Sequence, residues 1–473
     1  MTIRFFNTYT RRLEDFVPLE TGVVRMYNCG PTVYDFAHIG NFRSFLMADL
    51  LRRFLEWKGF AVRQVMNLTD VGHLTDDDVD RMEVGSGREK KTAWEIADFY
   101  AEAFLEDSRR LGLAKAWENP RATRHIPEMI ELNRKLVEKG LAYFSKDSLY
   151  FEVQKFPGYG RLSGNTLDEL EAGARVEVRS EKRDPRDFAL WKADPRHQMK
   201  WESPWGVGFP GWHVECSAMS MKYLGETLDI HTGGEDNIFP HHDCEIAQSE
   251  GATGRPFVRH WLHARFLLVG GEKMSKSLGN FYTVRDLAAA GYEGRAIRWA
   301  LLDGHYRQPA NFAVEGKGEA ARFVSLESAA GSLRTLDNLA TKLRFAAAPG
   351  ADPELPEILA KARREFDEAL SDDLDISRAR RAIFELAGEL NRRDVPRTDA
   401  AVALSLVREF DAVLGFLPAA EAELPAEVRE LVLAREAARK DRNWSLADEL
   451  RARIRERGYV VEDTPRGPVW KKA

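Results

Sequence analysis

Apolar residues near the start of the chain switch between the spacing of a strand and that of a helix. Residues 23–28 form a β-rich run, a Cys-Gly-Pro turn follows, and a second β-rich run occupies residues 61–68. Between the two runs, apolar residues recur at the three- and four-residue spacing of an amphipathic helix, at Phe42, Phe45, Leu46, Leu50, Leu51 and Leu55. The order strand, helix, strand predicts the first unit of a doubly wound, Rossmann-type parallel sheet, whose chemistry lies at the carboxyl ends of the strands.

This pattern is interrupted in the middle of the chain. Residues 126–139 have helical spacing, residues 143–153 indicate a hairpin, and Gly- and Pro-rich connections follow. Strand-like segments return at residues 228–232 and 266–269. We therefore interpret the middle segment as a connective subdomain inserted between the two halves of a Rossmann domain.

Helical spacing dominates beyond about residue 310. Apolar residues repeat at helical intervals in 323–343, 358–370 and 376–390, which predicts an α-helical bundle. The end of the chain combines a short β-like finish with an arginine-rich helix, which contains Arg451, Arg453, Arg455 and Arg457.

These patterns predict an α/β protein in five parts, in keeping with a length of 473 residues. Residues 1–119 and 206–310 form the two halves of the Rossmann domain. Residues 120–205 form the connective subdomain, residues 311–424 the helical bundle and residues 425–473 a small C-terminal domain.

The composition is that of an ordinary soluble protein. Hydrophobic residues make up 44% and charged residues 30%, and no run approaches the roughly 18 apolar residues that a membrane span needs. The start lacks the apolar core of a signal peptide, and three cysteines are too few for a disulfide framework. We expect a cytoplasmic protein with reduced thiols and no membrane partner. The net charge of −6 gives no general attraction to nucleic acid, so RNA contacts would depend on local basic patches.

Two short signatures lie far apart in the chain. His-Ile-Gly-Asn at 38–41 puts imidazole and amide donors at the start of the predicted helix, where a helix N-terminus favours anions. Lys-Met-Ser-Lys-Ser at 273–277 puts two lysines on a loop, and a Gly-Gly-Glu-Asp turn at 233–236 permits close approach of the backbone. Either signature alone is weak evidence, because such short strings occur by chance, and the lysine loop alone could be a solvated basic turn. Together they predict a site for ATP.

Thiols and imidazoles gather in three further segments. Cys29 precedes the first signature, Cys216 lies in Gly-Trp-His-Val-Glu-Cys, and residues 241–245 read His-His-Asp-Cys-Glu. His241 and Glu245 are four residues apart, so on a helix they share one face, and sulfur combined with imidazole favours zinc. The alternative is that the cysteines are buried apolar thiols and the histidines are surface residues.

The two signatures, in this order and about one nucleotide-binding domain apart, resemble the class I aminoacyl-tRNA synthetases. The cysteine and histidine segments are similar to the cysteinyl-tRNA synthetase family, and the resemblance extends over essentially the whole chain. The sequence departs from the family at Asn41, where a second histidine is usual, and at 67–73, where further acidic residues are expected.

The resemblance implies that L-cysteine is activated with ATP and Mg²⁺ and transferred to the 3′-terminal ribose of tRNA-Cys by a monomeric enzyme. The implied catalytic residues are His38, Asn41, Lys273 and Lys276. The implied ATP-binding residues are Gly30, Thr32, His38, Asn41, Gly234, Asp236 and Lys276.

The resemblance also implies three further sets of residues. One zinc ion would be held by Cys29, Cys216, His241 and Glu245, with His242 and Cys244 as rival ligands. The cysteine pocket would include Thr69, Trp212 and His231. The C-terminal domain would bind the anticodon through Arg442, Trp444, Asp448, Arg451 and Asp463. Zinc would select the thiol of cysteine over the hydroxyl of serine, so no editing domain is expected.

Two other functions remain open on the sequence alone. A ligase that joins cysteine to an amino sugar would share the zinc set and both signatures, but it would not need the helical region and basic tail. A noncatalytic tRNA-binding protein with the same fold would not need His38, Lys276 or the metal set.

Overall fold

The chain folds into two compact units. The computed structural model describes residues 2–72, 91–165, 181–193, 197–316, 318, 321–418, 425–464 and 467–472. The first unit comprises Met1–Ser325 and Ala369–Ser377, and the second comprises Leu326–Glu368 and Arg378–Ala473. Among the described helices, none is both long enough and apolar enough to cross a bilayer.

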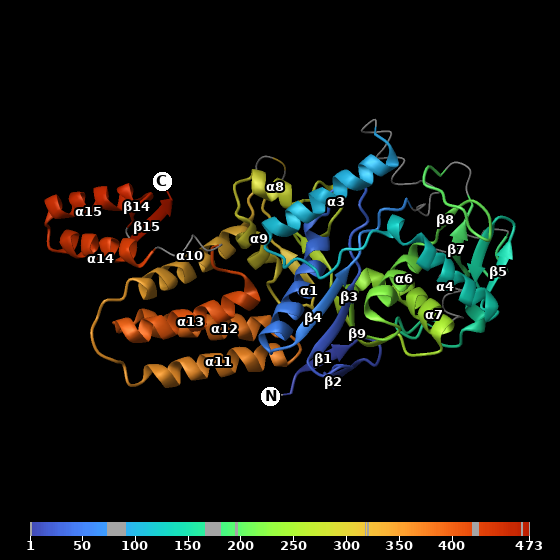
Figure 1. The fold of residues 1–473 in the computed structure, drawn as a ribbon, viewed down its shortest axis with the longest axis horizontal. Coiled ribbons are helices and arrows are strands. Elements are labelled where there is room, and N and C mark those ends of the chain that lie inside the picture. Colours follow the sequence, from blue (N-terminus) through green and yellow to red (C-terminus); the bar gives the residue numbers. More distant parts are fainter. Residues whose placement is uncertain are drawn as a thin grey trace. The chain divides into compact units, whose positions relative to one another are not determined.

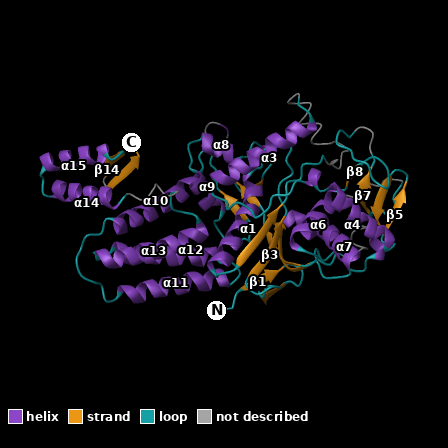
Figure 2. Ribbon diagram, viewed as in Figure 1, coloured by secondary structure: helices purple, strands orange, loops and turns teal. Residues whose placement is uncertain are grey.

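The first unit is built around a four-stranded sheet in which every pairing is parallel (Figure 1). The strand order is β10-β9-β3-β4, with the bounds Val258–Ala264, Leu228–Gly234, Val23–Asn28 and Ala61–Met66. Strands from the two predicted halves meet at the centre, where Tyr27 of β3 lies opposite His231 of β9. The predicted doubly wound α/β fold is confirmed (Figure 2).

Helices connect and cover these parallel strands. Helix α1 (Ile39–Trp57) connects β3 to β4, and α7 (Asp243–Thr253) connects β9 to β10. All six apolar positions predicted to form the inner face of α1 are buried. Helices α1 and α6 (Trp212–Leu224) both pack on the sheet. Helix α3 (Ala93–Arg110), which we did not predict, begins with a capping box between Thr92 and Glu95.

The insertion between the halves has a sheet of its own. Helix α4 (Ile126–Glu138) and the hairpin of β5 and β6 confirm the predicted helix and hairpin. The antiparallel order is β5-β6-β7-β8, with the bounds Ala142–Ser145, Ser148–Phe151, Phe188–Lys192 and Phe209–Pro210. The buried carboxylate of Asp187, just before β7, accepts hydrogen bonds from the Tyr143 hydroxyl at 2.7 Å and the Val153 backbone N–H at 3.0 Å.

The loop that carries the second signature begins at the end of a strand in a small separate sheet. The predicted strand at 266–269 is β11 (Leu267–Val269), which pairs with β12 (Glu272–Lys273) and β13 (Ala310–Phe312) rather than with the parallel sheet. Helices α8 (Val284–Ala289) and α9 (Gly294–Leu301) follow. At the N-terminus, the hairpin of β1 (Arg4–Asn7) and β2 (Arg12–Asp15) packs beside β10.

Helices also make up most of the second unit. The three predicted helices correspond to α10, α11 and α12, whereas α13 was not predicted. Their bounds are Val324–Arg344, Leu355–Ser371, Ile376–Asn391 and Arg397–Leu414. The stacked rings of Phe366 and Phe410, with centroids 4.3 Å apart, join α11 to α13.

The C-terminal end has its own small core around Val432, Ile454 and Trp470. It consists of α14, α15 and the hairpin of β14 and β15, with the bounds Ala426–Lys440, Trp444–Glu456, Tyr459–Thr464 and Gly467–Lys472. The limits of the five predicted parts stay a prediction, and the one at residue 424 lies outside the described residues.

Candidate active site and metal centre

A cavity of about 500 Å³ lies at the carboxyl ends of β3 and β9. The two signatures, which start 235 positions apart in the chain, both line it. So do all the residues predicted to bind ATP or to act in catalysis: Gly30, Thr32, His38, Asn41, Gly234, Asp236, Lys273 and Lys276. Trp212 and Cys29 line the same cavity, whereas Thr69 and His231 do not.

The first signature forms the N-terminal cap of α1. The His38 Nδ1 atom accepts a hydrogen bond from the Asn41 backbone N–H at 3.2 Å, and the Asn41 side-chain oxygen accepts one from the His38 backbone N–H at 3.1 Å. Asn41 therefore has a local structural role in this cap. Burial lowers the pKa of His38, with Lys276 acting in the same direction against Asp236, so the ring is neutral near pH 7.

Gly30 lies where two chain segments come too close for a side chain. A Cβ atom at this position would lie 1.7 Å from the backbone oxygen of Asn67. The Gly30 backbone N–H donates to the Asn67 side-chain oxygen at 2.8 Å, and the Asn67 amide donates to the Thr69 hydroxyl at 3.0 Å. Asn67 thus supports the turn at Gly30, which lines the cavity. His73, at the end of the 67–73 stretch, lies outside the described residues.

The four predicted zinc ligands converge from four segments. Cys29 follows β3, Cys216 lies on α6, His241 lies in the π-helical turn Ile238–His242, and Glu245 lies on α7. The two sulfurs are 3.7 Å apart, Cys29 Sγ is 3.6 Å from Glu245 Oε1, and His241 Nε2 is 3.1 Å from the same oxygen. One ligand atom from each residue lies within 4.8 Å of the others.

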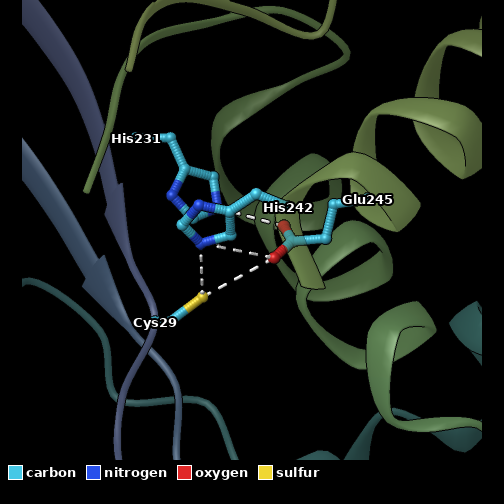
Figure 3. Close-up of side chains that lie close together, drawn as sticks. All are labelled: Cys29, His231, His242 and Glu245. Carbon is cyan, nitrogen blue, oxygen red and sulfur yellow. Dashed lines mark hydrogen bonds and ion pairs between the residues drawn. The ribbon is translucent and has the colours of Figure 1, made fainter. Parts of the chain in front are cut away.

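A second group of four overlaps the first and shares Cys29 and Glu245 (Figure 3). His242 Nε2 lies 3.4 Å from Cys29 Sγ and 3.8 Å from Glu245 Oε1, and His231 Nε2 lies 3.0 Å from Glu245 Oε2. Of the two rival ligands considered from the sequence, the structure brings His242 into a group. Cys244 is in neither of these groups of described residues, and its sulfur contacts the Tyr159 hydroxyl at 3.4 Å.

Burial and mutual contact set the charges in this cluster. Burial raises the pKa of Glu245, but His231 and His241 outweigh it and lower the value to about 2. Burial lowers the pKa of His241, but its contacts with Cys216 and Glu245 raise it to about 10. The hydrogen bond from Cys29 lowers the pKa of the Cys216 thiol to about 7. The cluster therefore holds a charged carboxylate against imidazole and thiol groups.

The three predicted pocket residues lie in different environments. The Trp212 side chain is 40% exposed at the cavity wall, and its ring lies 4.6 Å from that of His241. His231 is fully buried behind the wall, against Glu245. Thr69 is buried beside Gly30, where its backbone N–H donates to the Pro31 oxygen at 3.0 Å.

Sequence reasoning missed several residues that the structure brings to the site. His213 Nδ1 lies 2.8 Å from His241 Nδ1, and His263 Nε2 lies 2.8 Å from His242 Nδ1. Asp35 and Phe281 both line the cavity beside Lys276. Asp35 is three residues before His38, and His213 is three before Cys216. For these two, closeness in the sequence to a predicted site residue was therefore the available signal.

The five predicted tRNA-binding residues all belong to the C-terminal end. Trp444 begins α15 with its side chain 57% exposed, and the Arg439 guanidinium lies 5.6 Å from its ring. Arg442, Asp448 and Arg451 are exposed. Asp463 accepts two hydrogen bonds from Arg435, both 2.7 Å long. The Asp463 carboxylate thus has partners within the domain.

Family models match three stretches of the chain. The model described as the tRNA synthetases class I (C) catalytic domain matches residues 15–321. The DALR domain matches residues 365–418, and the cysteinyl-tRNA ligase anticodon binding domain matches residues 421–470.

Full-length relatives and a solved structure agree with these matches. The chain is 45% identical to a cysteine–tRNA ligase of Symbiobacterium thermophilum, with 100% of both chains covered. It is 43% identical to a cysteine–tRNA ligase of Thermococcus onnurineus, covering 100% of this chain and 99% of the relative. The fold resembles Mycobacterium tuberculosis methionyl-tRNA synthetase bound by methionyl-adenylate, with a TM-score of 0.59, 15% identity, and coverage of 90% and 96%. The catalytic-domain match and the full-length relatives show that this chain belongs to the cysteine–tRNA ligase family of class I tRNA synthetases.

Proposed function

We propose that this chain activates L-cysteine with ATP and Mg²⁺ to give cysteinyl-adenylate, and then transfers cysteinyl to the 3′-terminal ribose of tRNA-Cys. The observation that carries the proposal is that one cavity is lined by both signatures and by Cys29, a member of the buried Cys, His and Glu cluster. The nucleotide-binding and sulfur-binding chemistries are therefore adjacent.

The donor set fits one zinc ion held by Cys29, Cys216, His241 and Glu245. Tetrahedral zinc with zinc–sulfur bonds of about 2.3 Å places two sulfur ligands about 3.8 Å apart. The observed separation of 3.7 Å supports this set. It supplies two thiols, whereas the overlapping group supplies only one. When bound, zinc supplies a Lewis acid that coordinates thiolate strongly and hydroxyl weakly, which separates cysteine from serine.

In this arrangement His231 and His242 act as positioning residues behind the ligands. His231 Nε2 donates to the Glu245 oxygen that faces away from His241, and His242 Nε2 donates toward the Cys29 sulfur. His242 is itself oriented by His263, whose Nδ1 lies 2.8 Å from the Thr8 hydroxyl. Such outer hydrogen bonds fix ring orientation and tune ligand basicity.

The nucleotide half of the cavity supplies donors for a triphosphate. His38 Nδ1 accepts a backbone hydrogen bond, so the neutral ring carries its proton on Nε2 and can donate it to a phosphate oxygen. Lys273 and Lys276 add positive charge from the loop, and Asp236 offers a carboxylate to the ribose hydroxyls. These groups position ATP and neutralise the charge that develops as the cysteine carboxylate attacks the α-phosphate.

The C-terminal domain would read the anticodon of tRNA-Cys. The exposed Trp444 ring with Arg439 beside it offers a surface on which an unpaired base can stack, and the exposed Arg442 and Arg451 offer charge to phosphates. The match to an anticodon binding domain at 421–470 supports this role over the joining of cysteine to a small acceptor.

The test is ATP–pyrophosphate exchange with each amino acid, followed by charging of purified tRNA-Cys. We expect exchange with cysteine and not with serine or alanine, and cysteine-dependent charging of the tRNA. Exchange without charging would favour ligation to a small acceptor. Absence of exchange from folded protein with a full zinc content would contradict the proposal and favour a noncatalytic tRNA-binding role.

A further inference from the structure

One contact at the cavity is not accounted for by the roles assigned above. The Lys276 ammonium donates a hydrogen bond to Asp35 Oδ2 at 2.6 Å, and these residues are 241 positions apart in the chain. Asp35 lies in the segment between β3 and α1, and both side chains line the cavity. The contact therefore joins the loop of the second signature to the segment that leads into the first signature.

Phe281 provides a second surface for the same ammonium. The Lys276 Nζ atom lies 5.1 Å from the centre of the Phe281 ring, within the range of a cation–π interaction. The same ring also contacts His38, whose imidazole meets it edge to face with centroids 5.2 Å apart. One aromatic ring thus touches the main cation of one signature and the histidine of the other.

The backbone next to Phe281 is attached to the start of α1. The Ile39 N–H donates to the Tyr282 oxygen at 3.0 Å, and His38 forms an isolated antiparallel bridge with Thr283. The Phe281 ring is therefore carried by a backbone segment that is hydrogen-bonded to the start of α1. The loop before it is braced internally, because the Ser275 N–H donates to the Asn280 side-chain oxygen at 2.8 Å.

We propose that Asp35 is a positioning residue for Lys276. Together with the Phe281 ring, it holds the ammonium over the cavity before the nucleotide arrives, so the loop is already closed when ATP binds. The proposal rests on the proposed function, because the benefit is faster adenylate formation. Acting through Lys276, Asp35 pre-organises the cation that meets the triphosphate.

The two side chains are partly in water, so the effect is modest. The Lys276 side chain is 64% exposed and that of Asp35 is 23% exposed. Exposed ion pairs of this kind limit the expected change to about fivefold. A carboxylate that only blocked the site would act in the opposite direction, because its removal would ease the entry of ATP.

The test compares Asp35→Asn with the wild-type protein in two measurements. Without nucleotide, we expect trypsin to cut the Asn variant faster after Lys273 or Lys276, because the loop leaves its closed position more often. With substrates, we expect kcat for cysteine-dependent exchange to fall about fivefold, with zinc content and KM for cysteine unchanged. Asp35→Glu should restore part of both effects, and Asp35→Asn should have no effect on kcat in a Lys276→Met background.

Glu128→Gln is the matched control, because Glu128 accepts from Lys222 at the same 2.6 Å in an exposed pair outside the cavity. Wild-type cleavage and kcat in the Asp35→Asn variant would overturn the proposal. So would a higher kcat or a lower KM for ATP, which would identify the pair as a block. Phe281→Leu gives an independent test, since loss of the ring should also expose the loop to trypsin. Failure of the proposed function would instead appear as absence of cysteine-dependent exchange in the wild-type protein.

Discussion

The buried cluster of Cys, His and Glu side chains and the lysine loop both contribute to one cavity but are built in opposite ways. The side chains of His231, His242 and Glu245 have no exposed surface, whereas that of Lys276 is 64% exposed. Electrostatic interactions are strong where water is excluded and weak where it is present. Contacts within the cluster are therefore shielded from water, whereas the contacts of Lys276 are screened by it. Substitutions that remove one supporting contact should have larger effects in the cluster than on the loop.

The largest effect is expected from Cys216→Ser. The hydroxyl is a poor zinc ligand, so zinc content and cysteine-dependent exchange should fall together, the latter by about 100-fold or more. Metal analysis and exchange assays on the same preparation provide the measurement. Cys244→Ser is the control, because Cys244 is equally buried but contacts Tyr159 rather than the cluster.

Cobalt substitution sharpens this prediction, because thiolate charge-transfer absorption grows with the number of sulfur ligands. If Cys29 and Cys216 both bind, the absorption per bound cobalt ion should be about half as strong in the Cys216→Ser variant as in the wild-type protein. An unchanged band would show that the ion sits instead in the overlapping group with His231 and His242.

A smaller effect within the cluster is expected from His242→Leu. The variant loses the donor that faces Cys29 but keeps all four proposed ligands, so zinc affinity should fall by about 10–100-fold. Competition with a chelator of known affinity measures the change, and His242→Gln should fall between the variant and the wild-type protein. Complete loss of zinc at saturating metal would make His242 a direct ligand.

The sequence predicted the parts of this fold that depend on local spacing. The apolar stripe of α1, the strands β3 and β4 and the helices α10 to α12 lie within a few residues of their predicted positions. Each of these elements carries its own periodicity, so a short window contains the information. The helix α13, by contrast, was missed although it buries a regular apolar face.

Contacts between distant segments could not be predicted in this way. The pairing of Tyr27 with His231 joins strands about 200 residues apart, and this register decides which histidines face Glu245. The resemblance placed Cys29, Cys216, His241 and Glu245 in one set, but only tertiary packing brings His231 and His242 close enough to form a second. Asp35 was missed for the same reason, because its partner lies on a remote loop.

The C-terminal end extends the comparison to another exposed element. Trp444→Ala should raise KM for tRNA-Cys in charging by about tenfold, since stacking on an aromatic ring contributes about 1–3 kcal/mol per base. Cysteine-dependent exchange should be unchanged. The matched control is Leu446→Ala, which removes another exposed apolar side chain near the start of the same helix. Equal effects of the two variants would assign the loss to the fold of the domain.

The smallest effect is expected from the largely buried charge pair of Asp184 and Arg186, just before β7. The hydrogen bond from Arg186 lowers the pKa of Asp184 to about 2, and this carboxylate also accepts from Gln154 at 2.6 Å. The folded-state pKa lies below the unfolded value of about 3.9, so the contribution to stability is present above pH 4 and is lost as the pH falls toward 2. Asp184→Asn should therefore lower the free energy of unfolding at pH 7 by about 1–2 kcal/mol, which lowers the melting temperature. The difference in melting temperature from the wild-type protein should shrink in scans below pH 4.

The control is Glu131→Gln, in an exposed pair with Arg134 on α4. It should produce no comparable shift in melting temperature, because water screens that pair. A difference that stays constant with pH would show that Asp184 stabilises the subdomain through its shape and hydrogen bonds rather than its charge.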